Sequence, residues 1–119
     1  MKLLFTLFCL SIFEIGFAQH QKGIAFQAVA RNDQGIVLSN KQLQVRISIL
    51  TDTLTENIIY QEVIAIKTNP LGLLTILIGA KEQGKIISIG AFARIQWAQS
   101  SHFVRIEIDP ENKLQFTRI

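Results

Sequence analysis

Apolar and polar residues alternate along several short stretches of this chain. In residues 103–109 (FVRIEID), Val104, Ile106 and Ile108 fall on one side of an extended chain, and charged residues fall on the other. Residues 43–49 (LQVRISI) repeat this alternation, with aliphatic residues at every odd position. A period of two is typical of a β-strand that buries one face. Both stretches are therefore predicted to be strands.

Other segments are rich in β-branched residues but alternate less regularly. Residues 57–68 (NIIYQEVIAIKT) are predicted to form a strand that ends at Asn69-Pro70, because proline fixes φ and disfavours helix at the preceding residue. One face of this strand is expected to carry Ile58, Tyr60, Ile64 and Ile66. Residues 71–79 (LGLLTILIG) are apolar on both faces, which predicts a strand between two layers. Further candidate strands are 23–31, 36–38, 91–97 and 113–119, and 91–97 is also compatible with a short helix.

Turn-forming residues separate these stretches, and no window shows a convincing helical period. Six or seven short strands joined by Gly, Pro, Asn and Asp turns predict an all-β fold, a single antiparallel immunoglobulin-like β-sandwich. The stretch RNDQG at 31–35 is expected to close the first turn, and SNKQ at 39–42 the next.

The oxygen atoms of Asp33 and Asn40 raise the alternative of a calcium site in these turns. Ca²⁺ takes about six to eight oxygen ligands, and no D-x-D-x-[DN]-G spacing occurs in the chain. Turn chemistry is the favoured interpretation, because Asn and Asp hydrogen-bond to nearby backbone and Gly35 supplies a positive φ.

The first eighteen residues have the pattern of a secretory signal peptide. A short positive start, Met1-Lys2, precedes an apolar run over 3–15, and Gly16 and Ala18 are the small residues of a cleavage site before Gln19. A membrane anchor is the alternative, but the run is shorter than the ~20 residues that a spanning helix needs. We expect residues 1–18 to be removed and residues 19–119 to form the exported domain. The mature domain, without a membrane span, is then secreted, held at the cell surface or periplasmic.

Composition narrows the classes of function. Cys9 is the only cysteine and lies inside the signal, so the mature chain has neither a disulfide nor thiol chemistry, and a packed core must supply its stability. The net charge of +3 comes from scattered residues. Without a basic stripe to follow a phosphate backbone, a nucleic-acid partner is not expected.

The order of several short motifs resembles the amino-terminal β-domain of many exported proteins of Bacteroidetes. The motifs are Gly23 with Phe26-Gln27-Ala28-Val29-Ala30-Arg31, then Asp33, Gly35 and Val37-Leu38 before strand 43–50, then Thr68-Asn69 with Gly72-Leu73, and finally Ile95-Gln96-Trp97, Phe103-Val104 and Asp109-Pro110. The layout is also similar, more distantly, to transthyretin-like and carboxypeptidase-regulatory-like sandwiches. The resemblance implies a structural domain without chemistry of its own, which often precedes collagen-like or tail-fibre-like parts.

Members of that family continue past the Asp-Pro turn, whereas this chain stops at Ile119. A truncated copy, a shortened reading frame and a free-standing domain are the alternatives. A missing final strand would leave a sheet edge open, and an open apolar edge is a template for pairing with another chain. Self-association or a protein partner at such an edge is therefore expected.

No set of residues predicts catalysis, a cofactor or a metal. His20 lies beside the expected mature terminus, and His102 follows Ser100-Ser101 without a nucleophile elbow or an oriented acid. The strand acids Glu62, Glu107 and Asp109 are expected to face solvent, with Arg105 and Lys67 as ion-pair partners. Paired carboxylates of a glycosidase are the alternative for them. We therefore predict that the protein is not an enzyme.

Three aromatic residues, Phe92, Trp97 and Phe103, are close in sequence. A small sandwich needs large residues in its core, which is the favoured interpretation. An exposed aromatic row would instead suit carbohydrate stacking or a protein contact, with Trp97 and Phe103 as the candidate residues. Two functions follow: a non-enzymatic structural or assembly module of an exported, cell-surface or envelope-associated protein, or a small module that binds carbohydrate or cell-wall material.

Overall fold

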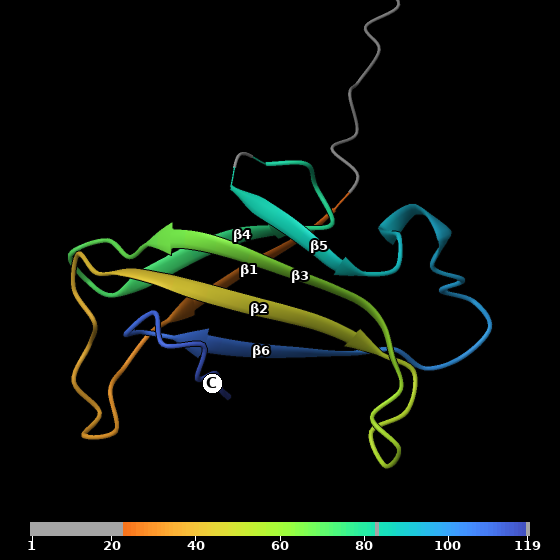
Figure 1. The fold of residues 1–119 in the computed structure, drawn as a ribbon, viewed down its shortest axis with the longest axis horizontal. Coiled ribbons are helices and arrows are strands. Elements are labelled where there is room, and N and C mark those ends of the chain that lie inside the picture. The colour runs from red at the N-terminus through yellow and green to blue at the C-terminus, as the bar shows by residue number, and fades with distance from the viewer. Residues whose placement is uncertain (1–22, 83, 119) are drawn as a thin grey trace, which may run out of the picture.

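The computed structural model describes residues 23–82 and 84–118, which form two antiparallel sheets packed face to face (Figure 1). The expected signal peptide, Cys9 and His20 lie outside these residues. The small sheet pairs β1 (Ile24–Val29) with β4 (Leu73–Ile78). The large sheet has the order β5 (Lys85–Ile89), β3 (Ile58–Lys67), β2 (Gln42–Leu50), β6 (Phe103–Asp109) and β7 (Thr117–Arg118). The predicted all-β sandwich is confirmed, with seven strands in the described part of the chain.

The core lies between β4 and the centre of the large sheet. The inward residues of β2 and β4 are almost completely buried, and they are Leu43, Val45, Ile47, Ile49, Leu74, Ile76 and Ile78. Each buried side chain of this size contributes roughly 1.5–3 kcal/mol to the free energy of folding. This row of aliphatic contacts holds the small sheet on the large one.

The strand register explains the alternation along the sequence. Val45 of β2 lies opposite Ile64 of β3 and Ile108 of β6, so aliphatic residues of three neighbouring strands share the inward face. The predicted inward positions of residues 43–49 are confirmed, as are those of Ile106 and Ile108, whereas Val104 at the start of β6 is exposed.

Three predicted strands are wrong or shorter than expected. Residues 36–38 make only one isolated pairing, between Arg31 and Val37, because the turn before them brings the chain straight back along Ala30–Asn32. Residues 91–97 contain a 3₁₀ turn, η1 (Phe92–Arg94), instead of a strand. Of residues 113–119, only Thr117–Arg118 pair in a sheet.

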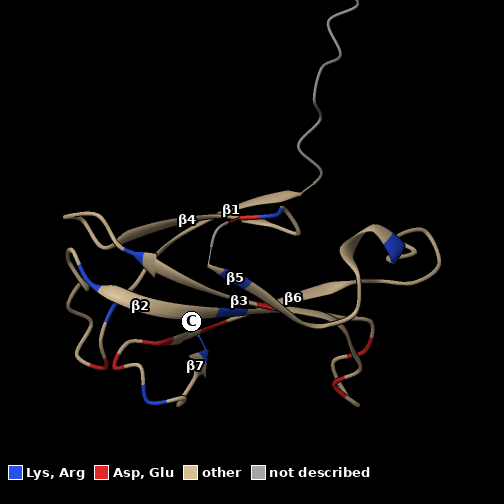
Figure 2. Ribbon diagram, turned by 45° about the horizontal axis from the view of Figure 1, so that its top comes forward, with Lys and Arg blue, Asp and Glu red and all other residues tan. Residues whose placement is uncertain are grey.

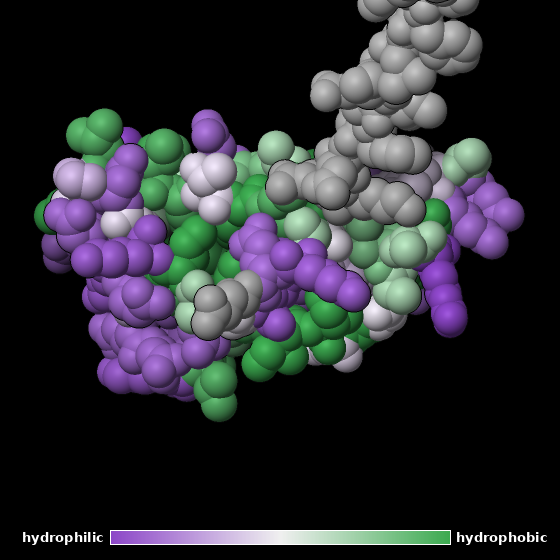
Figure 3. Space-filling view, turned by 90° about the horizontal axis from the view of Figure 1, so that it is seen from above, coloured by the Kyte–Doolittle hydropathy of each residue, from purple (hydrophilic) through white to green (hydrophobic). Residues whose placement is uncertain are grey.

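The expectation that residues 71–79 lie between two layers is also wrong. One face of β4 packs on the core, while Thr75 on its other face is exposed. Leu73 and Leu77, the other outward residues of β4, are half-buried. Seen from above, the middle of the molecule shows apolar atoms next to polar ones (Figure 3). The apolar pattern of β4 therefore arises because one face of the strand is buried in the core and its outer face is also largely apolar.

Two turns of the same Asn-x-x-Gly construction anchor the ends of β1 and β4. The side-chain oxygen of Asn32 accepts the N–H groups of Gln34 and Ile36, and that of Asn69 accepts those of Leu71 and Leu73, all at 2.9 Å. In each turn the glycine N–H donates to the asparagine carbonyl at 2.9 Å. The glycines, Gly35 and Gly72, have φ of 79° and 77°. Turn chemistry at RNDQG is thus confirmed, with Asn32 as its organising residue.

The two turns also contact each other. Ala30 donates its N–H to the carbonyl of Gly72 at 2.9 Å, and the Ser39 hydroxyl donates to the carbonyl of Pro70 at 2.6 Å. The buried Thr68 hydroxyl accepts the N–H of Lys41 at 2.9 Å. The Thr68–Leu73 turn therefore packs against the chain that leads from β1 into β2.

No helix within the described residues has both the length and the apolar character needed to cross a membrane.

Gly35 and Gly72 offer a matched test of this arrangement. Both have a positive φ, but a Cβ on Gly35 would meet nothing within 4 Å, whereas one on Gly72 would lie 3.1 Å from the Ala30 carbonyl oxygen and from Val37 Cβ. We expect Gly35→Ala to lower the free energy of unfolding by about 1 kcal/mol, from backbone strain alone. Gly72→Ala should lower it by roughly 2–4 kcal/mol, because crowding adds to the strain. Urea denaturation measures both, and equal losses would contradict the packing of the two turns.

Candidate functional site

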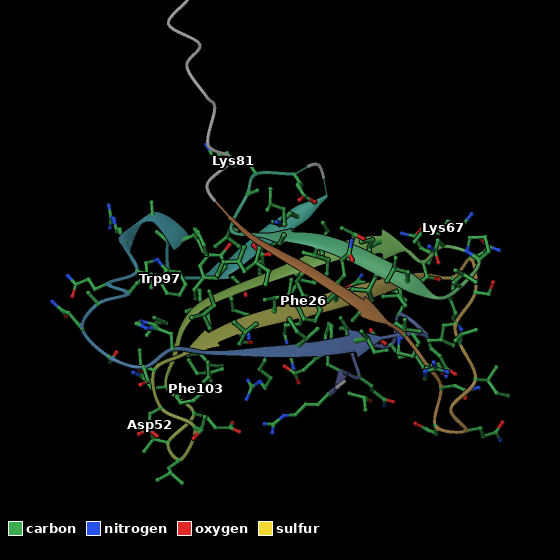
Figure 4. The ribbon with its side chains drawn as sticks, turned by 180° about the vertical axis from the view of Figure 1, so that it is seen from behind. Phe26, Asp52, Lys67, Lys81, Trp97 and Phe103 are labelled. Atoms are coloured by element: carbon green, nitrogen blue, oxygen red, sulfur yellow. The ribbon has the colours of Figure 1, made fainter. Side chains whose placement is uncertain are left out.

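Trp97 lies just after η1, at the end of the sandwich (Figure 4), and is 43 % exposed. Its ring meets the Phe92 ring edge-on at 5.6 Å between centroids, and the His102 ring at 5.0 Å. Phe92 in turn meets the buried Tyr60 at 5.5 Å. The favoured prediction of a core position is wrong for Trp97. Gly90, at φ 71°, turns the chain away from the large sheet before the 3₁₀ turn, so residues 91–97 join neither sheet.

Two hollows lie beside this row of contacting aromatic rings. One, of about 610 Å³, is mainly apolar and is lined by Gly79, Ala80, Lys81, Phe92, Ala93, Ile95 and Trp97. The other, of about 540 Å³, carries polar side chains, among them Thr51, Arg94, Gln96, Gln99, Ser100 and His102. Polar groups and a half-exposed aromatic ring thus lie at the same end of the molecule.

Phe103 does not join Trp97 in an aromatic row. It begins β6 opposite Leu50, is 43 % exposed, and lines a separate hollow of about 270 Å³ with Glu56, Arg105 and Arg118. The core interpretation is therefore wrong for Phe103 as well. The two candidate contact residues belong to different surfaces of the sandwich.

Glu62 is the clearest correction to the expected surface acids. It lies opposite Ile47 on the inward face of β3 and is fully buried. The Tyr60 hydroxyl donates to Glu62 Oε2 at 2.5 Å, and the Gly79 N–H donates to the same oxygen at 3.1 Å. Its cationic partner is Lys85, whose Nζ lies 3.3 Å from Oε1, and not Lys67. Ionised groups are rarely buried unless they are paired in this way.

Lys85 completes this buried cluster from the neighbouring strand β5. Its ammonium group donates to the carbonyls of Leu77 and Ala80, both at 2.8 Å, and its side chain is 2 % exposed. The cluster joins the end of β4 to β3 and β5. Sequence reasoning missed Lys85, because one lysine among scattered charges gives no sign of burial. A signal for Glu62 existed, since it falls between Tyr60 and Ile64 on the face expected to be apolar.

Glu107 points to the outer face of β6, as predicted, but it is only 7 % exposed. The Arg46 guanidinium donates to both of its oxygens, at 3.1 and 2.9 Å, and the Arg105 guanidinium lies 3.3 Å away. Burial raises the pKa of Glu107, but the hydrogen bond and charge of Arg46, with the charges of Arg105 and Arg118, hold it below its ordinary value. Phe116 covers the Arg46 guanidinium at 4.2 Å. The expected pairing with Arg105 is confirmed, while the expected exposure is wrong.

Asp109 is also buried, at 1 % exposure, and it holds the turn that follows β6. Its carboxylate accepts the N–H groups of Lys113 at 3.1 Å and Leu114 at 2.8 Å. All three strand acids thus have partners within the fold.

The remaining polar candidates from the sequence are Asp33, Asn40, His102 and the two serines before it. Asp33 and Asn40 are both exposed, and none of the hydrogen bonds among the described residues joins His102 to Ser100 or Ser101. Within the same residues, no group of three or more His, Cys, Asp or Glu side chains could hold a metal ion. His102 instead packs its ring against Trp97.

The chain was compared with known proteins, and it matches no family model, no curated protein and no solved structure.

Tyr60 provides a direct test of the buried cluster, because it is the only tyrosine in the chain. Burial, together with the hydrogen bond to Glu62 and its charge, raises the pKa of Tyr60 above its ordinary value of 10.0. The unfolded chain therefore releases this proton near pH 10 while the folded chain keeps it, and the stability that Tyr60 provides is lost as pH rises above about 10. Ultraviolet absorbance of the phenolate should show no titration of the folded protein near pH 10, but should show it in urea.

Tyr60→Phe supplies the matched stability measurement. Loss of the hydroxyl should lower the free energy of unfolding by about 1–3 kcal/mol at neutral pH, because Glu62 loses a buried donor. The difference between the two proteins should shrink above pH 10. A folded wild-type protein whose Tyr60 titrates at its ordinary pKa would contradict the buried hydrogen bond.

Proposed function

We propose that this chain is a non-enzymatic structural or assembly module of an exported, cell-surface or envelope-associated protein. The observation that carries the proposal is the use of its buried charges. Glu62 is bound by Tyr60, Gly79 and Lys85, and Glu107 by Arg46 and Arg105. These groups connect strands to one another, which is the work of a scaffold.

Catalytic acids and bases must come within hydrogen-bond reach of a substrate. Glu62 and Asp109 are at most 1 % exposed, and Glu107 is held by a bidentate arginine, so none of the three presents a free carboxylate to solvent. This geometry favours a structural role for the strand acids over the glycosidase alternative.

The proposed location outside the cytoplasm rests on the sequence of residues 1–18, with its positive start, apolar run and small residues before Gln19. Residues 19–119 contain no cysteine and so cannot form a disulfide. The stability of an exported domain of this kind must come from packed aliphatic side chains. The resemblance to amino-terminal domains of exported Bacteroidetes proteins agrees with both points, and suggests a domain that stands beside longer surface structures.

One observation favours a second candidate, a module that binds carbohydrate or cell-wall material. Trp97 is 43 % exposed, and the polar hollow that contains Gln96, Gln99 and His102 lies at the same end of the sandwich. An aromatic ring beside hydrogen-bonding side chains is a common way to hold a polar ring-shaped ligand. Phe103 lines another hollow and would not share this site.

Export can be tested by expressing the full chain in a bacterial host and determining the amino terminus of the product. We expect a product outside the cytoplasm that begins at Gln19, because Ala18 supplies the small residue before the cleaved bond. Ala18→Tyr should leave the longer precursor, since a bulky residue does not fit that position. A cytoplasmic product with residues 1–18 intact would overturn the proposed export.

A hydrolase activity at catalytic stoichiometry, abolished by one substitution, would overturn the non-enzymatic role.

Trp97→Ala distinguishes the two candidate functions, with Phe103→Ala as a control of equal exposure on another surface. As a structural module, both variants should stay folded, each losing roughly 1–3 kcal/mol of unfolding free energy, and retention on insoluble peptidoglycan should be equally low for all three proteins. Retention of the wild type that disappears only in a folded Trp97→Ala protein would establish the second candidate. Unfolding of Trp97→Ala would show that the contacts of its ring with Phe92 and His102 are needed for the fold.

A further inference from the structure

The described strands leave four sheet edges free, and three of them carry features that oppose further pairing. β7 is only two residues long, and β5 is interrupted by a bulge where it pairs with Gln61 and Glu62 of β3. On β4, the Leu77 carbonyl accepts Lys85 Nζ, and the Leu73 carbonyl and N–H are bonded to Asn69. Short strands, bulges and inward-pointing charges are the usual means of protecting an edge.

The edge of β1 has none of these features. Its six residues, IAFQAV, pair with β4 in unbroken register and contain no charge, no proline and no bulge. Figure 2 shows charged residues in the turns and on the large sheet, and none along β1. A regular, uncharged edge of this kind is a template for another strand.

The hydrogen-bond pattern fixes which backbone groups of β1 are free. Ala30 donates its N–H to the carbonyl of Gly72, on the β4 side. In an antiparallel strand, the backbone N–H and C=O groups of successive residues point alternately to one neighbouring strand and to the other. Phe26 and Ala28 therefore bond to β4, while the N–H and C=O groups of Ala25, Gln27 and Val29 point to the open edge. The hydrogen bonds of β4 agree with this alternation. Its Leu77 and Leu73 carbonyls, opposite Ala25 and Val29, point away from β1 and bond to Lys85 and Asn69.

We propose that β1 pairs with β1 of a second copy of this chain, antiparallel about a two-fold axis at Gln27. This inference rests on the proposed assembly function and names its partner. In this register Gln27 lies opposite Gln27 of the second copy, and Ala25 lies opposite Val29. Every backbone group that β1 presents at its edge then gains a partner, because all three outward-directed residues face outward-directed residues.

The side chains are compatible with the same register. On the core side, Phe26 lies opposite Ala28 of the second copy, which places a large residue beside a small one. On the outer side, the two Gln27 amides meet at the axis and can hydrogen-bond to each other. The register brings no charged residue of β1 against its own copy, although the chain as a whole carries +3. Two positively charged molecules can therefore approach along this edge without direct repulsion.

The pairing would join two small sheets into one continuous four-stranded sheet with the order β4, β1, β1, β4. A two-stranded sheet is marginal by itself, and added strands strengthen it. One strand pair buries less than the roughly 1,200 Å² that stable complexes need, so the association should be weak and should depend on protein concentration. An assembly module that acts at high local density on a surface needs only such a contact.

Gln27→Lys tests the axis, and Thr75→Lys is its matched control. Thr75 lies directly opposite Gln27 on the same exposed face of the small sheet, one strand further from the edge. In the proposed dimer, the two lysines introduced by Gln27→Lys would lie on neighbouring strands, whose backbones are about 4.8 Å apart. The two lysines introduced by Thr75→Lys would lie on strands that are three spacings apart, about 14 Å. That larger separation exceeds the Debye length of about 8 Å at physiological salt.

Sedimentation of the purified exported protein over a wide concentration range measures the effect. We expect wild type to dimerise, Gln27→Lys to weaken the dimer by about tenfold or more, and Thr75→Lys to change it by less than about threefold. Gln27→Glu alone should weaken it as well. A mixture of the Gln27→Lys and Gln27→Glu proteins should restore association as a heterodimer, because opposite charges then meet across the axis.

Three outcomes would overturn the inference. A monomer at all concentrations would exclude the pairing, while correct export and processing would leave the proposed function standing. A dimer that resists Gln27→Lys but is lost in Ile87→Lys would place the contact on β5. Equal weakening by Gln27→Lys and Thr75→Lys would show that net charge matters and the two-fold axis does not.

Discussion

The small sheet has only two strands, and everything else in the structure depends on how it is held against the large one. In the middle, Leu74, Ile76 and Ile78 pack on the inward row of β2. At the start of β4, the turn organised by Asn69 bonds to the segment that enters β2. At its other end, Lys85 and Glu62 bind the backbone of Leu77, Gly79 and Ala80. A two-stranded sheet would be marginal without this combination of apolar and polar contacts.

Buried polar groups also hold the backbone in this arrangement. Thr68 follows the end of β3 and Asp109 ends β6, while Glu62 lies within β3 and binds the backbone just after β4. Each accepts N–H groups or pairs with a cation, so the cost of removing it from water is offset by specific partners. A buried ion pair adds little net stability compared with aliphatic side chains. The bonds of these groups nevertheless hold the backbone beside the ends of β3, β4 and β6.

The sequence was sufficient to predict most of the fold. Strict alternation in residues 43–49 and 103–109 identified β2 and β6, because a half-buried strand has no other pattern. It could not identify the partner of Glu62, since the approach of Lys85 depends on β5 pairing with β3 and on the β4–β5 turn. It also could not place Trp97 or Phe103, because burial at the end of a sandwich is decided by how the chain turns at Gly90 and by which loops cover β6. Of the candidate site, the residues were predictable and their separation onto two surfaces was not.

The pairing of β1 with β4 also constrains the order in which the chain folds. β2 and β3 are neighbours in sequence and form a hairpin through a short connection, so they can pair early. β1 and β4 are separated by that whole hairpin, and their pairing must wait until it brings their ends together. Of the described strands, the first to leave the ribosome is therefore expected to be completed among the last. Until then this strand, which carries no charged side chain, has no partner strand on either edge.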